Sequence, residues 1–247
     1  KKYTFKESKF IFYIKYSALV KRDDDCKYFY RVKIDDLDNS FRELTGFKFR
    51  RSIEKENVDV EFLDYVEKGN TIIVESTIAP MSTDNIIKPI FEDKGFIIGE
   101  DIYLAHCPER VLPGQIINEL INNDRIVGGI TPLCSDKAAE VYSIFVKGNI
   151  MKTEAKTAEL SKCMENTFRD VNIALANELA KISAEIGVNA LDVIKLANKH
   201  PRVNIHSPGP GVGGHCLAID PYFIYALAPD TAKIIKLARD TNKSMPS

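Results

Sequence analysis

One cysteine, Cys216, stands directly after a loop that has almost no side chains. The loop reads Gly209-Pro-Gly-Val-Gly-Gly-His215. Such a sequence lets a ligand approach the backbone closely and leaves backbone N–H groups free to bind an oxyanion. A thiol in this place is well sited for covalent catalysis. The alternative is that Cys216 is a small buried hydrophobic residue, as free cysteines usually are.

Lys162 and Asn166 lie four residues apart in a segment with helical periodicity, so they share one face of the predicted helix. By themselves they are typical of a solvated polar face. The other candidate groups are a nucleophile, two carboxylates and a hydroxyl: Cys216, Asp220, Glu109 and Thr77. Together these groups suit chemistry in which a carbonyl is attacked, an oxyanion is stabilised and water is later activated.

A metal site is the competing hypothesis for the histidines and cysteines. His106-Cys107 and His215-Cys216 are adjacent pairs of good ligands. Adjacent side chains rarely point at one ion, and no other spacing in the chain supports zinc. We therefore expect no metal, and His106 and Cys107 can equally well close a strand.

The composition indicates a soluble cytoplasmic protein. The chain has 247 residues and a formal net charge of -1, so no nucleic-acid partner is expected. Its five cysteines are scattered and form no Cys-x-x-Cys pair, which is typical of reduced thiols. No apolar run approaches the roughly 20 residues of a membrane span, and the start of the chain lacks the features of a signal peptide.

From Asn70 onward, strands alternate with helices. A buried-type strand is predicted at Thr71–Glu75, followed by a helix capped by Ser82 and ended by Gly95. The apolar stripe of this helix is expected to consist of Ile86, Ile87, Ile90 and Phe91.

Further strands are predicted at Ile102–Ala105 and Arg125–Gly128, and a helix at Cys134–Val146. This alternation predicts a parallel sheet whose ligands bind beyond the carboxyl ends of the strands. The loops that begin at Ser76 and Cys107 occupy that position.

The most regular segment is a long amphipathic helix from about Thr153 to Ile186, ended by Gly187. Its apolar residues recur every three or four positions: Leu160, Met164, Phe168, Val171, Leu175, Leu179, Ile182 and Ile186. A neighbouring helix at Ala190–Lys199 and the same long helix of another subunit would cover them, so we predict a symmetric homodimer. The alternative is a long core helix within a monomer.

The first 57 residues differ from the rest because they concentrate aromatic residues among Lys, Arg and Asp. The segments Phe10–Tyr16 and Tyr28–Ile34 favour strands. Basic and aromatic residues together could bind single-stranded nucleic acid. A small sheet with a solvated face explains the same composition, and the residues assign this region no function.

Several pieces of the chain, in the same order, resemble the nucleotide-sugar 6-dehydrogenases that oxidise UDP-glucose, GDP-mannose and UDP-N-acetylhexosamines. The pieces are Glu75-Ser-Thr-Ile78, Cys107-Pro-Glu-Arg-Val-Leu-Pro-Gly114, Thr157-Ala-Glu-Leu-Ser-Lys-Cys-Met-Glu-Asn166, Asn177-Glu178, Arg202 and the residues from Gly209 to Pro221. The resemblance covers roughly residues 58–247. The Cys216-Leu-Ala-Ile-Asp-Pro221 ending is most similar to that of members acting on UDP-N-acetyl-D-mannosamine.

The resemblance implies two successive hydride transfers from C6 of the sugar to NAD, which convert a primary alcohol to a carboxylate. Cys216 would form a thiohemiacetal and then a thioester, and a nearby ammonium would favour its thiolate. Lys162, Asn166 and Asp220 would stabilise the oxyanion and order a water. Glu109 would act as the general base in hydrolysis.

The resemblance also implies binding residues. Ser76 and Thr77 would contact the NAD cofactor or a water. The remaining residues would contact the UDP-sugar, with Arg202 reaching across the dimer: Arg110, Val111, Leu112, Arg202, Gly211 and Gly213.

One departure from the family pattern shapes the expected organisation. Residues 1–57 contain no glycine-rich G-x-G-x-x-G turn for the NAD pyrophosphate. We expect a partial Rossmann-like domain at 58–152, a central helical dimerisation domain at 153–236, and at 237–247 a connector to a C-terminal nucleotide-binding domain. The fold class is thus α/β followed by an all-helical domain. Two alternatives are a non-catalytic dimerising remnant and a fusion whose first segment binds something else.

Overall fold

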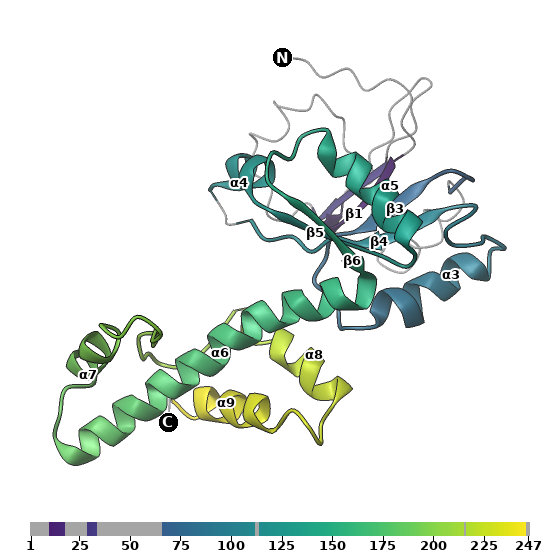
Figure 1. Cartoon of the computed structure of the whole chain (residues 1–247). Helices are drawn as coiled ribbons and strands as arrows, with labels where there is room; N and C mark the ends of the chain where they lie inside the picture. The colour runs from purple at the N-terminus through teal and green to yellow at the C-terminus, as the bar shows by residue number, and fades with distance from the viewer. Residues whose placement is uncertain (1–9, 18–28, 34–65, 112–113, 215, 246–247) are drawn as a thin grey trace. The chain divides into compact units, whose positions relative to one another are not determined.

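The computed structural model describes residues 10–17, 29–33, 66–111, 114–214 and 216–245 (Figure 1). Contacts divide the chain into two compact units. The first comprises residues 1–77 and 81–159, and the second comprises residues 78–80 and 160–247. The predicted domain boundaries, after residues 57, 152 and 236, remain predictions.

The first unit is built on one six-stranded sheet with the order β2-β1-β3-β4-β5-β6. Its strands are β1 (Phe10–Ser17), β2 (Phe29–Lys33), β3 (Thr71–Val74), β4 (Tyr103–His106), β5 (Arg125–Gly129) and β6 (Ile150–Glu154). All neighbours pair in parallel except β4 and β5, which are antiparallel. The predicted α/β sheet is confirmed, but it is not wholly parallel, and β1 and β2 belong to it.

The helices follow the predicted alternation, and the structure adds some that the sequence patterns did not indicate. They are η2 (Thr83–Ile87), α3 (Lys88–Glu92), α4 (Ile116–Asn122), α5 (Pro132–Ser143), α6 (Ala155–Ile186), α7 (Ala190–Ala197), α8 (Asp220–Leu227) and α9 (Lys233–Lys243). α4, α8, α9 and β6 had not been predicted as individual elements. No helix in the described part of the chain is both long enough and apolar enough to cross a membrane.

The core of the first unit lies between the sheet and α5. Thr131 caps α5, because its hydroxyl accepts a hydrogen bond from the Cys134 N–H at 3.2 Å. The buried cluster consists of Ile73, Ala105, Cys107, Val127, Ala138, Val141 and Tyr142. The uninterrupted apolar runs of the strands predict that these residues are buried, and the strand residues of this cluster are buried.

The helical turn after β3 differs from the prediction at Ser82. Ser82 has helical backbone angles and makes no side-chain capping hydrogen bond. Glu159, from the start of α6, is the acceptor instead. Its carboxylate accepts from the Met81 N–H at 2.6 Å, from the Thr83 N–H at 2.8 Å and from the Thr83 hydroxyl at 2.5 Å. These bonds also hold Met81 at a positive φ of 73°, which side chains rarely adopt.

The predicted apolar stripe of this helix is only partly correct. Phe91 is buried, whereas Ile86 and Ile90 are exposed to 61% and 43%. The reason is that η2 is a π-helical turn, which holds more residues than an α-turn and shifts the phase of the side chains that follow.

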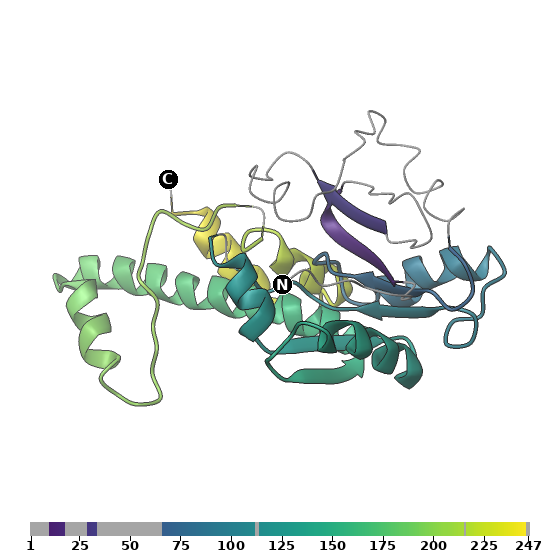
Figure 2. The same ribbon diagram turned by 90° about the horizontal axis from the view of Figure 1, so that it is seen from above.

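α6 is the long predicted helix, and Gly187, at a φ of 75°, ends it. Both views show α7 at its C-terminal end, and α8 and α9 beside its middle part (Figures 1 and 2). The side chains that α6 buries are mostly small or polar: Cys163, Asn166, Thr167, Asp170, Ala174, Asn177 and Ser183. The solvated-surface interpretation of the Asn166 face is therefore wrong.

The apolar residues of α6 lie largely outward. The most exposed of them are Leu160 (40%), Met164 (43%), Phe168 (59%), Leu175 (56%), Ile182 (46%) and Ile186 (68%). The ring of His206 lies edge-on to that of Phe168, with 6.4 Å between the centroids, but the face stays largely exposed. A core helix of a monomer would instead bury such residues.

We expect Glu159→Gln to lower the free energy of unfolding by about 1–3 kcal/mol, because an amide keeps one acceptor oxygen for three donors and loses the charge. Urea unfolding followed by circular dichroism measures this. Glu178→Gln, an exposed position on the same helix, serves as the control and should change stability by less than about 0.5 kcal/mol. An equal loss in both variants would contradict a capping role for Glu159.

Candidate active site

Cys216 is an exposed free thiol just before α8. Its carbonyl accepts hydrogen bonds from the backbone N–H of Ile219 at 3.0 Å and of Asp220 at 2.9 Å, so the end of the loop is fixed to the first turn of the helix. The interpretation of Cys216 as a buried hydrophobic residue is therefore wrong. The neighbouring His215 lies outside the described residues.

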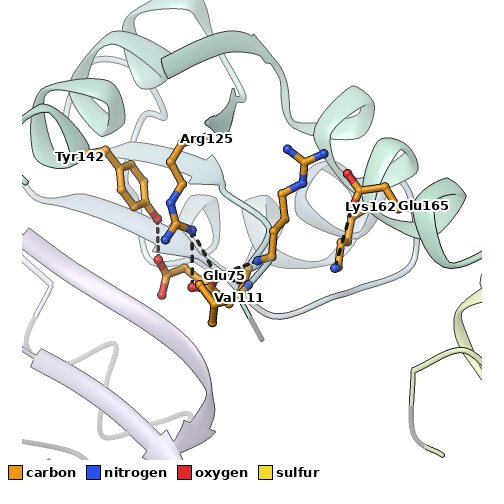
Figure 3. A network of polar contacts seen from close by, with 8 residues as sticks. Glu75, Val111, Arg125, Tyr142, Lys162 and Glu165 are labelled. Atoms are coloured by element: carbon orange, nitrogen blue, oxygen red, sulfur yellow. Dashed lines mark hydrogen bonds and ion pairs between the residues drawn. The ribbon is translucent and has the colours of Figure 1, made fainter. Parts of the chain in front are cut away.

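The first residue of α8 is bonded directly to α6. The Asn166 side-chain amide donates to Asp220 Oδ2 at 2.6 Å, and these residues are 8% and 1% exposed. One turn earlier on α6, Lys162 has a side chain that is 14% exposed and lies 3.8 Å from Glu165 Oε2 (Figure 3). The structure thus brings Asn166 and Asp220 together in the second unit. The Lys162 ammonium lies on the same face of α6.

The other end of the glycine-rich loop is held by buried polar side chains that the sequence patterns did not single out. Asn177 accepts from the Gly209 N–H at 2.8 Å and donates to Asn242 Oδ1 at 2.9 Å. Asn242 in turn donates to Asp170 Oδ1 at 2.9 Å, and Arg239 bonds the same oxygen at 2.5 Å. These contacts tie the loop to α6 and α9, and Asn177 had been noted only as part of a motif.

The two predicted loop glycines have different constraints. Gly211 has a φ of 105°, and a Cβ atom there would lie 2.4 Å from the Asn242 carbonyl oxygen. A side chain at this position is therefore excluded by the backbone. At Gly213 a Cβ atom would meet nothing within 4 Å. A substrate contact at either position remains a prediction.

The remaining substrate-binding predictions fall on accessible segments. Arg202 is exposed in a turn after α7, where its N–H donates to His200 Nδ1 at 3.3 Å. Arg110 and Val111 are half-buried after β4. Leu112 lies outside the described residues.

In the first unit, Glu109 follows β4 and is held by three donors. Its Oε1 accepts from the N–H of Arg110 at 2.7 Å and of Val111 at 3.0 Å. The Arg125 guanidinium lies 3.3 Å from the same oxygen. The Glu109 side chain is 31% exposed, so water can reach the carboxylate.

A second carboxyl group, Glu75, lies buried beside this pair. The Tyr142 hydroxyl donates to Glu75 Oε1 at 2.5 Å. Burial raises the pKa of Glu75 to about 7, although the Tyr142 hydrogen bond opposes the rise. Sequence reasoning assigned no role to Glu75, Arg125 or Tyr142. The available signal was that Glu75 ends a predicted strand and begins the Glu75-Ser-Thr-Ile78 motif.

The sheet has a topological switch point, where a dinucleotide site is expected. β1 and β3 are parallel neighbours. After β1 the chain continues to β2 on one side of this pair, whereas after β3 it continues to β4 on the other side. Dinucleotides bind where the strand order reverses in this way. Ser76 is buried and Thr77 half-buried just after β3, so they fit the β3 side of the site. Residues 18–28, which follow β1, contain no glycine, so they do not fit the expected pyrophosphate turn.

His106 and Cys107 are fully buried at the end of β4 and just after it. Burial lowers the pKa of His106 to about 4 and raises that of the Cys107 thiol above its ordinary range. The part of the chain that the structure describes contains no group of three His, Cys, Asp or Glu side chains able to hold a metal ion.

Comparison with protein-family models gives two matches. Residues 156–244 match the central domain of the UDP-glucose/GDP-mannose dehydrogenase family, and residues 55–146 match the NAD binding domain of the same family.

Individual relatives agree with these matches. A UDP-N-acetyl-D-mannosamine dehydrogenase of Methanocaldococcus jannaschii is 58% identical over 182 residues, which are 74% of this chain and 41% of that protein. An NDP-N-acetyl-D-galactosaminuronic acid dehydrogenase of Ralstonia solanacearum is 50% identical over 188 residues, covering 73% and 44% of the two chains. The chain therefore spans less than half the length of these curated relatives.

A solved structure extends the similarity to more of the chain. The native structure of a UDP-N-acetyl-mannosamine dehydrogenase from Staphylococcus aureus has a TM-score of 0.71 and 49% sequence identity. The match covers 98% of this chain and 52% of that one.

The raised pKa of Glu75 predicts a pH dependence of stability. Between pH 4.5 and about 7 the folded chain retains a proton that the unfolded chain has released, so the free energy of unfolding falls as the pH rises through this window. Glu75→Gln removes this dependence. We expect its stability relative to the original chain to rise by about 3 kcal/mol from pH 4.5 to pH 8. Urea unfolding at several pH values measures the difference, and a difference that does not vary with pH would contradict the assignment.

Proposed function

Because the chain belongs to the UDP-glucose/GDP-mannose dehydrogenase family, we propose that it catalyses the NAD-dependent oxidation of the C6 alcohol of a UDP-sugar to the carboxylate. UDP-N-acetyl-D-mannosamine is the proposed substrate, because the M. jannaschii and S. aureus relatives carry that name. The observation that carries the proposal is the exposed Cys216 at the end of the glycine-rich loop, next to the buried Asp220–Asn166 pair. The unpaired cysteines support a reducing, cytoplasmic location.

Cys216 is the proposed nucleophile. Its thiolate adds to the C6 aldehyde that the first oxidation forms, and the product is a thiohemiacetal whose oxygen carries negative charge during the addition. The Lys162 ammonium and the Asn166 amide are the groups proposed to stabilise that charge. NAD, when bound, accepts one hydride from C6 in each oxidation, and the second oxidation leaves a thioester on Cys216.

Hydrolysis of the thioester completes the reaction. Glu109 is the proposed general base that takes a proton from the attacking water, because its carboxylate is partly exposed and already held by backbone donors. Asp220, buried and bonded to Asn166, is proposed to orient that amide. Ser76 and Thr77 are proposed to contact the cofactor, and Arg110, Val111, Leu112, Gly211 and Gly213 the substrate.

The experiment is NADH formation at 340 nm with UDP-N-acetylmannosamine, UDP-N-acetylglucosamine and UDP-glucose in turn. We expect turnover with the first sugar, and a loss on the order of 10³-fold or more in Cys216→Ser, because serine is a far weaker nucleophile without an activating base. Cys134→Ser, which changes a buried thiol that has no proposed role, is the control. Silence with all three sugars from a folded chain would favour the non-catalytic remnant.

We also propose that the chain forms a homodimer through the outward apolar face of α6, with Arg202 reaching the sugar nucleotide bound by the other subunit. Phe168, Leu175 and Ile182 recur every seven residues on this face and are 59%, 56% and 46% exposed. A contiguous exposed apolar stripe of this length is typical of a protein interface.

The double variant Phe168→Glu, Leu175→Glu should be monomeric, because two like charges would be buried at each symmetric contact. Light scattering coupled to gel filtration should show about half the mass of the original chain. Ile97→Glu, which changes an exposed apolar residue of the first unit, should leave the mass unchanged. A monomeric original chain would refute the proposed dimer.

A further inference from the structure

Glu109 is held by a buried arginine. Arg125 is the first residue of β5, and its side chain is 2% exposed. One of its guanidinium nitrogens, Nη1, lies 3.3 Å from Oε1 and 3.4 Å from Oε2 of Glu109. A charged donor shared almost equally between both oxygens restrains the rotation of the carboxylate.

β5 runs antiparallel to β4, and this explains why Arg125, the first residue of β5, lies near the end of β4. The antiparallel register pairs Ala105 with Gly129 and His106 with Gly128. Continued by three residues beyond His106, the same register brings position 109 opposite position 125. In a wholly parallel sheet the first residue of β5 would lie at the other end of the strands, away from the loops that follow β3 and β4.

The other contacts of the Arg125 guanidinium show why it needs Glu109 as its countercharge. Its Cζ lies 5.5 Å from the centre of the Tyr142 ring, a cation–π contact. Its Nε and Nη2 atoms are buried and have no hydrogen-bond partner in the described part of the chain. A buried guanidinium without a countercharge is costly, so the Glu109 carboxylate and the Tyr142 ring compensate it.

The neighbouring Glu75 does not replace Glu109 as the countercharge. Its carboxyl group is bonded to the Tyr142 hydroxyl, and burial favours its neutral form up to a pH near its raised pKa of about 7. Glu109 is the carboxylate to which the structure gives ion-pair contacts with Arg125.

We propose that Arg125 is the positioning residue for Glu109. It fixes the carboxylate so that Oε1 accepts the N–H groups of Arg110 and Val111, while the same guanidinium also restrains Oε2. This role rests on the proposed function of Glu109 in thioester hydrolysis. In that step the water oxygen bonds to the thioester carbon, a proton passes to Glu109, and the C–S bond breaks to release the Cys216 thiolate.

The first test is independent of activity and follows amide hydrogen exchange by NMR in the full chain. In Arg125→Gln, the amides of Arg110 and Val111 should exchange at least about tenfold faster, because Glu109 is no longer held against them. Asn149 supplies the internal control, since its N–H donates to Asp124 and its carbonyl accepts from the Arg125 N–H. Its amide should exchange within about twofold of the original rate.

The second test is the response of NADH formation to the same substitution. Arg125→Gln should lower kcat by at least about tenfold without raising KM for the UDP-sugar, because slower hydrolysis lets the thioester accumulate while substrate binding is not impaired. Arg125→Lys, which keeps the charge, should recover part of kcat. Lys137→Gln, on the surface of α5, should change neither parameter.

The outcomes separate the two proposals. Unchanged exchange at Arg110 and Val111 in Arg125→Gln overturns the positioning role, and so does equal acceleration at Asn149, which would show a merely structural residue. A rise in KM without a fall in kcat also overturns it. If the original chain forms no NADH, the proposed function fails, and the exchange rates alone decide whether Arg125 positions Glu109.

Discussion

The second unit depends on one constraint: α6 buries its polar face and not its apolar face. Asn166, Asp170 and Asn177 are each 8% exposed or less, so each needs a hydrogen-bond partner. Those partners are the first residue of α8, two side chains of α9 and the start of the glycine-rich loop. The loop that carries Cys216 is therefore anchored at both ends, and the apolar side chains of the helix remain largely exposed.

The first unit has a corresponding constraint in the direction of β5. Its reversal places a buried arginine beside the loops that follow β3 and β4. Glu109 is then held by one side chain and two backbone donors, while Glu75 is bonded to Tyr142. Two carboxyl groups thus lie in different environments near the ends of β3 and β4, and burial raises the pKa of the deeper one, Glu75, to about 7.

Local patterns in the sequence predicted the elements and several of the site residues. The period of α6, its end at Gly187 and the shared face of Lys162 and Asn166 follow from spacing alone. Spacing does not state which face of a helix is covered, because that depends on segments more than 50 residues away. The capping of Thr83 by Glu159, and the pairing of Glu109 with Arg125, are long-range contacts of the same kind. The direction of β5 also escaped prediction, since strand composition does not determine strand orientation.

The most direct measurement of the central claim is the mass of the peptide that contains Cys216. The chain with Glu109→Gln, which should acylate but hydrolyse slowly, would be mixed with NAD and UDP-N-acetylmannosamine, quenched in acid and digested. The account predicts that this peptide gains the mass of the oxidised sugar nucleotide as a thioester, and that Cys216→Ser abolishes the gain. An unmodified Cys216 peptide, found together with NADH formation, would contradict covalent catalysis at this loop.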